Sequence, residues 1–232
     1  MARGPLRQGL PAGYAARVPS SAIATAITSS ISGYLLLDHP YYEAWQNGAL
    51  RMEDLRSYAE QYRHFERWLP VVLSAAAAQM GQGEPRRLVE ANLADELANP
   101  RPHVELFDGF ARAVGAVDQV VASAATAELV GTYSDAAGSG PIPLLAVVAA
   151  YETQGADIAT TKAAALTSHY GLDASETEFW TVHANVEQEH SAWTVQALEV
   201  MNSSSDEVEH WAARSAQAWW QFLDERQSAR AA

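Results

Sequence analysis

Apolar residues recur at intervals of three and four along most of this 232-residue chain, and alternating β-branched segments are nearly absent. This period places the apolar side chains on one face of a helix, so it favours an all-α fold. A chain of this length can bury a substantial core in one domain. We therefore expect a single bundle of seven or eight helices over residues 19–232. Residues 1–18, rich in glycine and proline, are expected to form a flexible arm.

Prolines, glycines and capping residues set the expected helix boundaries. A capping box, Ser175-Glu-Thr-Glu178, is expected to open one helix. Pro100 and Pro102 forbid a continuous helix between Glu96 and His103. The expected helices cover residues 20–37, 53–80, 85–98, 103–114, 117–131, 144–170, 175–201 and 204–225, with a loop over residues 134–143.

Two imidazoles and a carboxylate share one helix face near the C-terminus. His183, Glu187 and His190 stand at positions i, i+4 and i+7. On a helix these positions fall within about 60° of one another, so their side chains can converge on a single ion. The alternative is a polar helix face with solvated charges.

Three further residues are candidate ligands. Glu96 at a helix end and His103 after the proline break form a candidate pair, against the alternative of a surface turn. Glu152 follows an apolar segment, and a buried unpaired carboxylate costs several kcal/mol. A metal ion, an arginine partner or an exposed position would each account for Glu152.

Composition limits the chemistry. The chain has no cysteine, which removes thiolate sites and cysteine nucleophiles, so any metal must be held by His, Asp and Glu. Such ligands suit iron, manganese or zinc. A net charge of −13 makes nucleic acid an unsuitable partner, and the longest apolar run is about half the length of a membrane span. We expect a cytoplasmic protein with no membrane association.

Lys162 is the only lysine in the chain, since the other 14 basic residues are arginine. A single lysine can mark a position that requires a compact, deprotonatable amine. Chance survival of one lysine is the alternative interpretation.

Five motifs occur in an order that resembles one superfamily. They are Leu-Xaa-His-Pro-Tyr-Tyr-Xaa-Xaa-Trp, Tyr-Ala-Xaa-Gln-Tyr, Asn-Leu-Xaa-Asp-Glu with a histidine seven residues after the glutamate, Tyr-Glu-Xaa-Gln, and His-x3-Glu-x2-His. The chain resembles, over nearly its whole length, the haem-oxygenase-like dimetal oxidases, which share the bundle of TenA and PqqC proteins but bind two non-haem irons. The resemblance implies six metal ligands: Glu96, His103, Glu152, His183, Glu187 and His190.

Within that superfamily the chain is most similar to CADD-type 4-aminobenzoate synthases. In those proteins a tyrosine is sacrificed as the source of the aromatic product, and a lysine is also needed. Tyr42 and Lys162 stand at these positions, and Tyr151 precedes the glutamate as it does there. Two residues differ from the pattern: Glu187 replaces an aspartate, and Arg63 replaces an aromatic residue.

The resemblance and the ligand set together imply an O2-dependent non-haem diiron enzyme. Its cofactors would be two Fe ions cycling between Fe2+ and Fe3+, with manganese as an alternative in one site and O2 as cosubstrate. The expected substrate is a small amine or amino acid, undergoing C–H cleavage, desaturation, fragmentation or N-oxygenation. Arg63 or Arg67, one to one and a half helical turns from Tyr58 or Tyr62, is a candidate to hold a substrate carboxylate. We also expect a homodimer, and an external electron donor is compatible with this chemistry.

Three other functions are alternatives for a helical chain of this kind. One is a self-sacrificing 4-aminobenzoate synthase that uses Tyr42 and Lys162. Another is a non-enzymatic helical binding module, which predicts no metal. A TenA-like thiamine hydrolase is disfavoured because its nucleophilic cysteine does not exist in this chain.

Overall fold

The computed structural model describes residues 21–98 and 100–230, and the expected N-terminal arm lies outside these ranges. Within them the chain is all-α, as the sequence predicts, but it forms nine α-helices rather than seven or eight. The elements are α1 (Ala22–Ile31), the 3-10 helix η1 (Leu36–Asp38), α2 (Pro40–Gln46), α3 (Met52–Gln79), α4 (Glu84–Ala98), α5 (His103–Ala113), α6 (Ala124–Ser139), α7 (Pro141–Tyr170), α8 (Glu178–Val200) and α9 (Ser205–Arg230).

The largest difference from the predicted boundaries lies around α6. The predicted helix over residues 117–131 begins only at Ala124, and the predicted loop over 134–143 is wrong because α6 continues to Ser139. Side chains of α3 hold the segment before α6 in an extended path. Gln61, Arg63 and His64 donate hydrogen bonds to the carbonyls of Val121, Val117 and Val120, at 3.1, 3.0 and 2.9 Å. These backbone oxygens are therefore not available to helical partners.

The N-terminal cap of α8 also differs from the prediction. Ser175 and Glu178 do not form the expected capping box, and α8 begins at Glu178 with Thr177 as its N-cap. Instead, Asp173 Oδ1 accepts hydrogen bonds from the backbone nitrogens of Ser175 and Glu176 at 2.8 and 3.1 Å. The Glu176 carboxylate accepts a hydrogen bond from the Asp173 nitrogen at 2.9 Å. The reciprocal pair therefore occurs two residues earlier than predicted and shapes the turn before the helix.

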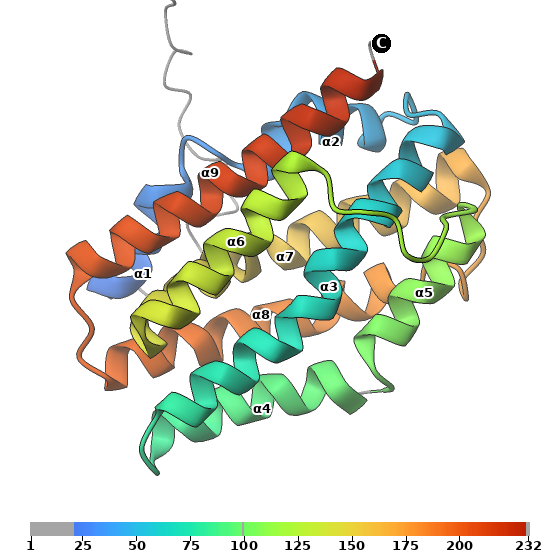
Figure 1. The fold of residues 1–232 in the computed structure, drawn as a ribbon. Coiled ribbons are helices and arrows are strands. Elements are labelled where there is room, and N and C mark those ends of the chain that lie inside the picture. The colour runs from blue at the N-terminus through green and yellow to red at the C-terminus, as the bar shows by residue number, and fades with distance from the viewer. Residues whose placement is uncertain (1–20, 99, 231–232) are drawn as a thin grey trace, which may run out of the picture.

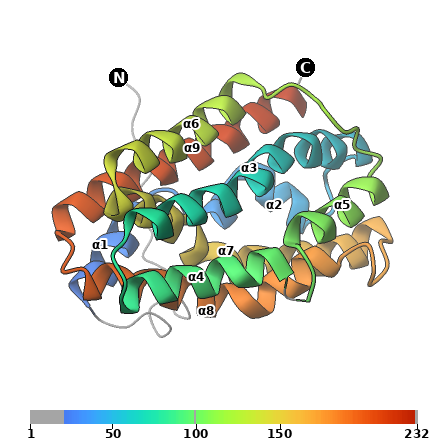
Figure 2. The same ribbon diagram turned by 60° about the horizontal axis from the view of Figure 1, so that its bottom comes forward.

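Helix α7 runs through the middle of the bundle. It packs against α8 and α9, and also against α6, α3 and α1. In Figure 2, α6 and α9 lie along one side, α4 and α8 along the other, and α3 and α7 between them. Residues 143–152 of α7 are all buried, which is expected of a helix that is apolar on every side. Within the described ranges, neither α7 nor any other helix is long and apolar enough to cross a membrane.

Helix α2 is short and lies at one end of the bundle, where it packs against α7 and α9 and precedes the start of α3 (Figure 1). Its N-cap, His39, accepts a hydrogen bond from the Tyr41 nitrogen at 3.0 Å, and Pro40 supplies the restricted φ that suits a first helical turn. The inward face of α2 buries Tyr41, Tyr42 and Trp45.

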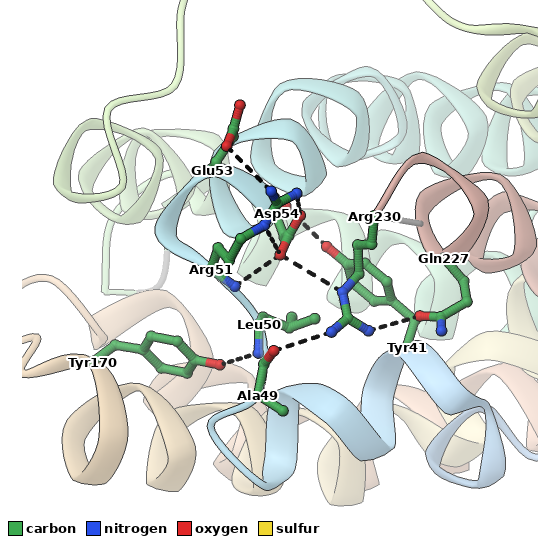
Figure 3. Close-up of polar contacts among 9 residues, drawn as sticks. All are labelled: Tyr41, Ala49, Leu50, Arg51, Glu53, Asp54, Tyr170, Gln227 and Arg230. Atoms are coloured by element: carbon green, nitrogen blue, oxygen red, sulfur yellow. Dashed lines mark hydrogen bonds and ion pairs between the residues drawn. The ribbon is translucent and has the colours of Figure 1, made fainter. Parts of the chain in front are cut away.

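A polar cluster fixes the connection between α2 and α3 (Figure 3). Arg230 of α9 donates to the Ala49 carbonyl at 3.0 Å, and its Nε lies 3.6 Å from Asp54 Oδ2. Tyr170, the last residue of α7, accepts a hydrogen bond from the Leu50 nitrogen at 3.1 Å. The Tyr41 hydroxyl donates to the Asp54 carbonyl at 2.9 Å. The ends of α7 and α9 and the start of α3 therefore hold α2 in place, and with it Tyr42.

Candidate metal centre

The first group of candidate ligands comes from three helices. Glu96 in the last turn of α4, His103 at the start of α5 and His183 of α8 offer ligand atoms that lie within 4.8 Å of one another. The proline break between α4 and α5 turns the chain so that Glu96 Oε2 lies 3.0 Å from His103 Nδ1. His183 Nδ1 donates to the Phe179 carbonyl at 2.8 Å. Because that bond fixes the tautomer, His183 Nε2 is left with a free lone pair for an ion.

The second group lies beside the first, between α7 and α8. Glu152, Glu187 and His190 also offer ligand atoms within 4.8 Å of one another. Asn92 Nδ2 donates to Glu152 Oε1 and Thr194 Oγ1 donates to Glu152 Oε2, both at 2.7 Å. These two hydrogen bonds orient the carboxylate of Glu152 in the way that outer partners orient metal ligands.

Two carboxylates connect the groups. Glu96 Oε1 lies 3.7 Å from His190 Nδ1 of the second group, and Glu187 Oε1 lies 4.0 Å from His183 Nε2 of the first. All six predicted ligands are buried. The structure therefore brings the six residues together as two adjacent groups of three, with Glu96 and Glu187 each close to both.

The electrostatics of the two ligand groups favour a bound positive charge. Burial, followed by neighbouring carboxylates, raises the pKa of Glu187 well above its ordinary value. Burial lowers the pKa of His183 to about 3, and the charge of His103 contributes to the shift. Burial also raises the pKa of Glu66, a further carboxylate on α3 that faces Glu96. Within the described residues, Glu187 Oε2 and His190 Nδ1 are buried atoms without a hydrogen-bond partner.

Such a site fits divalent metal ions. Buried carboxylates are costly unless they are paired or bound to a metal, and neutral imidazole with carboxylate suits iron and manganese. Burial alone would raise the pKa of Glu96, but the hydrogen bond and charge of His103 lower it below its ordinary value. The protein can thus hold Glu96 ionised and His183 neutral, which are the protonation states that bind metal.

Lys162 lies elsewhere on α7, in a pocket of aromatic rings. Its Nζ is 2.8 Å from the Tyr42 hydroxyl and 2.7 Å from the Tyr58 hydroxyl, and these two hydroxyls are 2.8 Å apart. Burial lowers the pKa of Lys162 well below its ordinary value. Five ring centroids lie between 4.1 and 5.5 Å from Nζ. They belong to Tyr42, Trp45, Tyr58, Tyr62 and Trp180.

Tyrosine side chains connect this pocket to the ligand groups. Tyr151, next to the ligand Glu152, shares a hydrogen bond of 2.9 Å with the Tyr62 hydroxyl. The Tyr62 and Tyr58 rings are stacked, with centroids 5.4 Å apart. Tyr58 in turn contacts Tyr42 through their hydroxyls. Four buried tyrosines therefore form a continuous series of contacts from Tyr151, the sequence neighbour of Glu152, to Lys162.

The structure gives Arg63 a different set of partners. Its Nε lies 3.0 Å from Asp108 Oδ1 and its Nη1 lies 2.9 Å from Asp118 Oδ1. These partners belong to α5 and to the segment before α6, and neither is a predicted ligand or a member of the Lys162 pocket. The role of Arg63 in holding a substrate carboxylate stays a prediction.

The residues that support the candidate ligands carry only a weak signal in the sequence. Asn92 is four residues before Glu96, and Thr194 is four after His190, so each lies one helical turn from a ligand on the same face. Tyr58 of the Tyr-Ala-Xaa-Gln-Tyr motif contacts Lys162 as closely as Tyr42 does. Glu66, four residues after Tyr62, could have been found by asking which carboxylates share the aromatic face of α3.

Comparisons with known proteins agree with this geometry. A family model described as iron-containing redox enzyme matches residues 56–223. A 4-aminobenzoate synthase from Nitrosomonas europaea is 34% identical over 216 residues, covering 85% of this chain and 88% of that protein. A CADD-like protein of unknown function from Nostoc punctiforme has a TM-score of 0.69 at 18% identity, covering 88% of this chain and 97% of the other. A domain with a haem-oxygenase-like fold from Shewanella denitrificans has a TM-score of 0.71 at 14% identity, covering 90% of each chain. These two structures confirm the expected fold class.

Proposed function

The chain belongs to the family of iron-containing redox enzymes, and from this we propose that it is a non-haem dimetal oxidase that uses O2. Glu96, His103 and His183 would hold one iron, and Glu152, Glu187 and His190 the other, with manganese as an alternative in one site. Bound ferrous iron supplies the electrons that reduce O2 and so generates the oxidant. The observation that carries this proposal is the pair of buried, adjacent ligand groups.

We further propose that the product is 4-aminobenzoate and that Tyr42 supplies its ring. A tyrosine side chain and 4-aminobenzoate share a ring with one carbon and one heteroatom in para positions. The conversion would break the Cα–Cβ bond and oxidise Cβ to a carboxylate, with O2 as the oxidant. The phenolic oxygen would leave as water and an amine nitrogen would take its place, with the Lys162 amine as the candidate donor. Lys162 Nζ lies 2.8 Å from the phenolic oxygen of Tyr42, where that nitrogen has to arrive. The name of the Nitrosomonas relative supports the same product.

The aromatic contacts explain how an oxidant formed at the metals would act on Tyr42. Tyr151, Tyr62 and Tyr58 lie in a series between Glu152 and Tyr42, joined by two hydroxyl contacts of 2.8 and 2.9 Å and one ring stack. Each hydroxyl of the series has a neighbour that can exchange a proton with it. Tyr42 itself is 1% exposed, so a reaction there is shielded from water.

A second candidate function uses the same metals on a free substrate. In that interpretation a small amine or amino acid enters the bundle and is oxidised, and no tyrosine is consumed. The hydrogen-bonded group of Lys162, Tyr42 and Tyr58 favours the self-sacrificing reaction, because it fills the pocket with the chain's own side chains. A homodimer and an external electron donor remain predictions.

One experiment separates these functions. The protein is loaded with Fe2+ under nitrogen, mixed with O2, and analysed for intact mass and for released 4-aminobenzoate. We expect each reacting chain to lose the mass of a tyrosine side chain, localised to residue 42 by peptide mapping, with product in the filtrate. Product formed only after adding a free amino acid, with the chain mass unchanged, would support the second candidate. Absence of iron uptake would contradict both and support the binding module.

A further inference from the structure

Gly155 lies on the central helix α7 directly beneath the carboxylate of Glu187. A Cβ atom built at residue 155 would lie 2.7 Å from Glu187 Cδ, 2.8 Å from Oε2 and 3.0 Å from Cγ. Real Cβ atoms essentially never approach other heavy atoms within 3.0 Å, so a side chain at residue 155 would displace Glu187. The space above Gly155 is therefore occupied by a candidate metal ligand.

A glycine inside a helix needs a reason, because it weakens the helix relative to alanine. The α7 sequence around Gly155 is rich in alanine, including Ala156 and Ala159. Two other helical glycines, Gly131 and Gly138 of α6, have no atom within 4 Å of a built Cβ. Contact with Glu187 therefore distinguishes Gly155 from these two glycines.

The position of Glu187 depends on that contact. Its Oε1 lies 4.0 Å from His183 Nε2 in the first ligand group, while Glu187 itself belongs to the second. Its Oε2, which faces Gly155, is buried without a hydrogen-bond partner. Because residue 155 has no side chain, the Glu187 carboxylate has room to lie between the two ligand groups.

We propose that Gly155 is a positioning residue for the metal centre, because its missing side chain lets the Glu187 carboxylate serve both ligand groups. The inference rests on the proposed function, since it assumes that the two groups bind metal. The size of the side chain at residue 155 and the length of the side chain at residue 187 must then match. A larger residue at 155 requires a shorter acid at 187.

The test uses the full chain and Mn2+ alone, which needs no turnover. Mn2+ is titrated under nitrogen into wild type, Gly155→Ala, Gly155→Ala/Glu187→Asp and the control Gly131→Ala, with free Mn2+ followed by electron paramagnetic resonance. We expect wild type and Gly131→Ala to bind two ions, one for each ligand group. Gly155→Ala should bind the second ion about tenfold or more weakly, because displacing a group that orients a ligand has an effect of this size.

The double variant tests whether contact with Glu187 causes the weaker binding of the second ion. Aspartate is one methylene shorter, so its carboxylate withdraws from the added methyl group, and the affinity for the second ion should return toward the wild-type value. Without metal, Gly155→Ala should unfold at the same temperature as wild type or a slightly higher one, because alanine favours the helix and the displaced atoms are the flexible end of one side chain. The proposal is overturned if Gly155→Ala binds both ions like wild type, if its metal-free form unfolds at lower temperature, or if Glu187→Asp restores nothing. Failure of wild type to bind Mn2+ or Fe2+ would instead overturn the proposed function.

Discussion

The amine of Lys162 and the hydroxyl of Tyr42 lie 2.8 Å apart, and each side chain is 1% exposed. Burial lowers the pKa of Lys162 well below its ordinary value and raises the pKa of Tyr42. Burial therefore favours the neutral form of both groups. A neutral amine can accept a proton from the phenol, and its nitrogen carries a lone pair that a lysine ammonium lacks.

Replacing Lys162 by methionine should abolish product formation and stabilise the metal-free protein. An unfolded lysine, with a pKa of about 10.4, binds a proton that the folded chain excludes. The wild-type free energy of unfolding therefore rises with pH between the lowered folded pKa and about 10.4. Lys162→Met removes that dependence, so its advantage over wild type should shrink as pH rises from 6 to 9. Chemical denaturation at several pH values measures this. An advantage independent of pH would mean that Lys162 is charged in the fold.

Phenylalanine at residue 42 and at residue 58 should have different effects on the product. Tyr42→Phe removes the phenolic oxygen of the proposed ring source, and no 4-aminobenzoate should form. Tyr58→Phe removes one of the two hydroxyls that contact Lys162. Because a hydrogen bond contributes on the order of 1 kcal/mol, we expect the yield of product to be up to about tenfold lower. Quantifying 4-aminobenzoate by mass spectrometry after one exposure to O2 compares the two. The reverse order of yields would identify Tyr58 as the source.

Asn92→Leu and Thr194→Val should each weaken metal binding without removing a ligand. Each variant deletes one of the two hydrogen bonds that orient the Glu152 carboxylate. Loss of such an outer partner lowers metal affinity by about 10–100-fold. Competition with a chelator of known affinity measures the change. Equal affinity in wild type and both variants would show that Glu152 is oriented by other means.

The two ion pairs of Arg63 should differ in their effect on stability. Asp108→Asn removes the negative charge beside a buried guanidinium, and a hydrogen bond between charged groups contributes about 1.5–3 kcal/mol, so the variant should lose about 1–2 kcal/mol. Asp118 is mostly exposed, and Asp118→Asn should change the free energy of unfolding by about 0–1 kcal/mol. Urea denaturation at pH 7 compares the two variants. Little effect from Asp108→Asn, together with loss of activity on a free acid, would favour the predicted role of Arg63 in binding substrate.

The common face of the three candidate ligands on α8 could be predicted because its geometry is local. His183, Glu187 and His190 share one helix, where a spacing of four and three residues fixes a common face. The break between Glu96 and His103 was evident from Pro100 and Pro102, and α4 and α5 begin and end accordingly. Local sequence carries this information because neither feature depends on a distant partner.

The parts that were missed depend on distant contacts. The extended segment before α6 is held by Gln61, Arg63 and His64, which lie more than 50 residues away. The α6 helix passes through Gly138 because its buried face packs against α3, α7 and α9, and this packing outweighs the low helix propensity of glycine. The match between Gly155 and Glu187 joins two helices, so no single stretch of sequence reveals it.

The complete burial of Tyr42 also determines what becomes of the protein after the proposed reaction. Cleavage at Cβ would leave a glycine and an empty space among Trp45, Tyr58 and Lys162, which are all buried. Deleting a buried aromatic side chain lowers the free energy of unfolding by about 3–5 kcal/mol. A used chain would then unfold more often than a fresh one and be more readily degraded by proteases. Each protein molecule would react once, so the amount of product would be set by the rate at which the protein is synthesised. The cavity left by the reaction would direct the used chain to degradation.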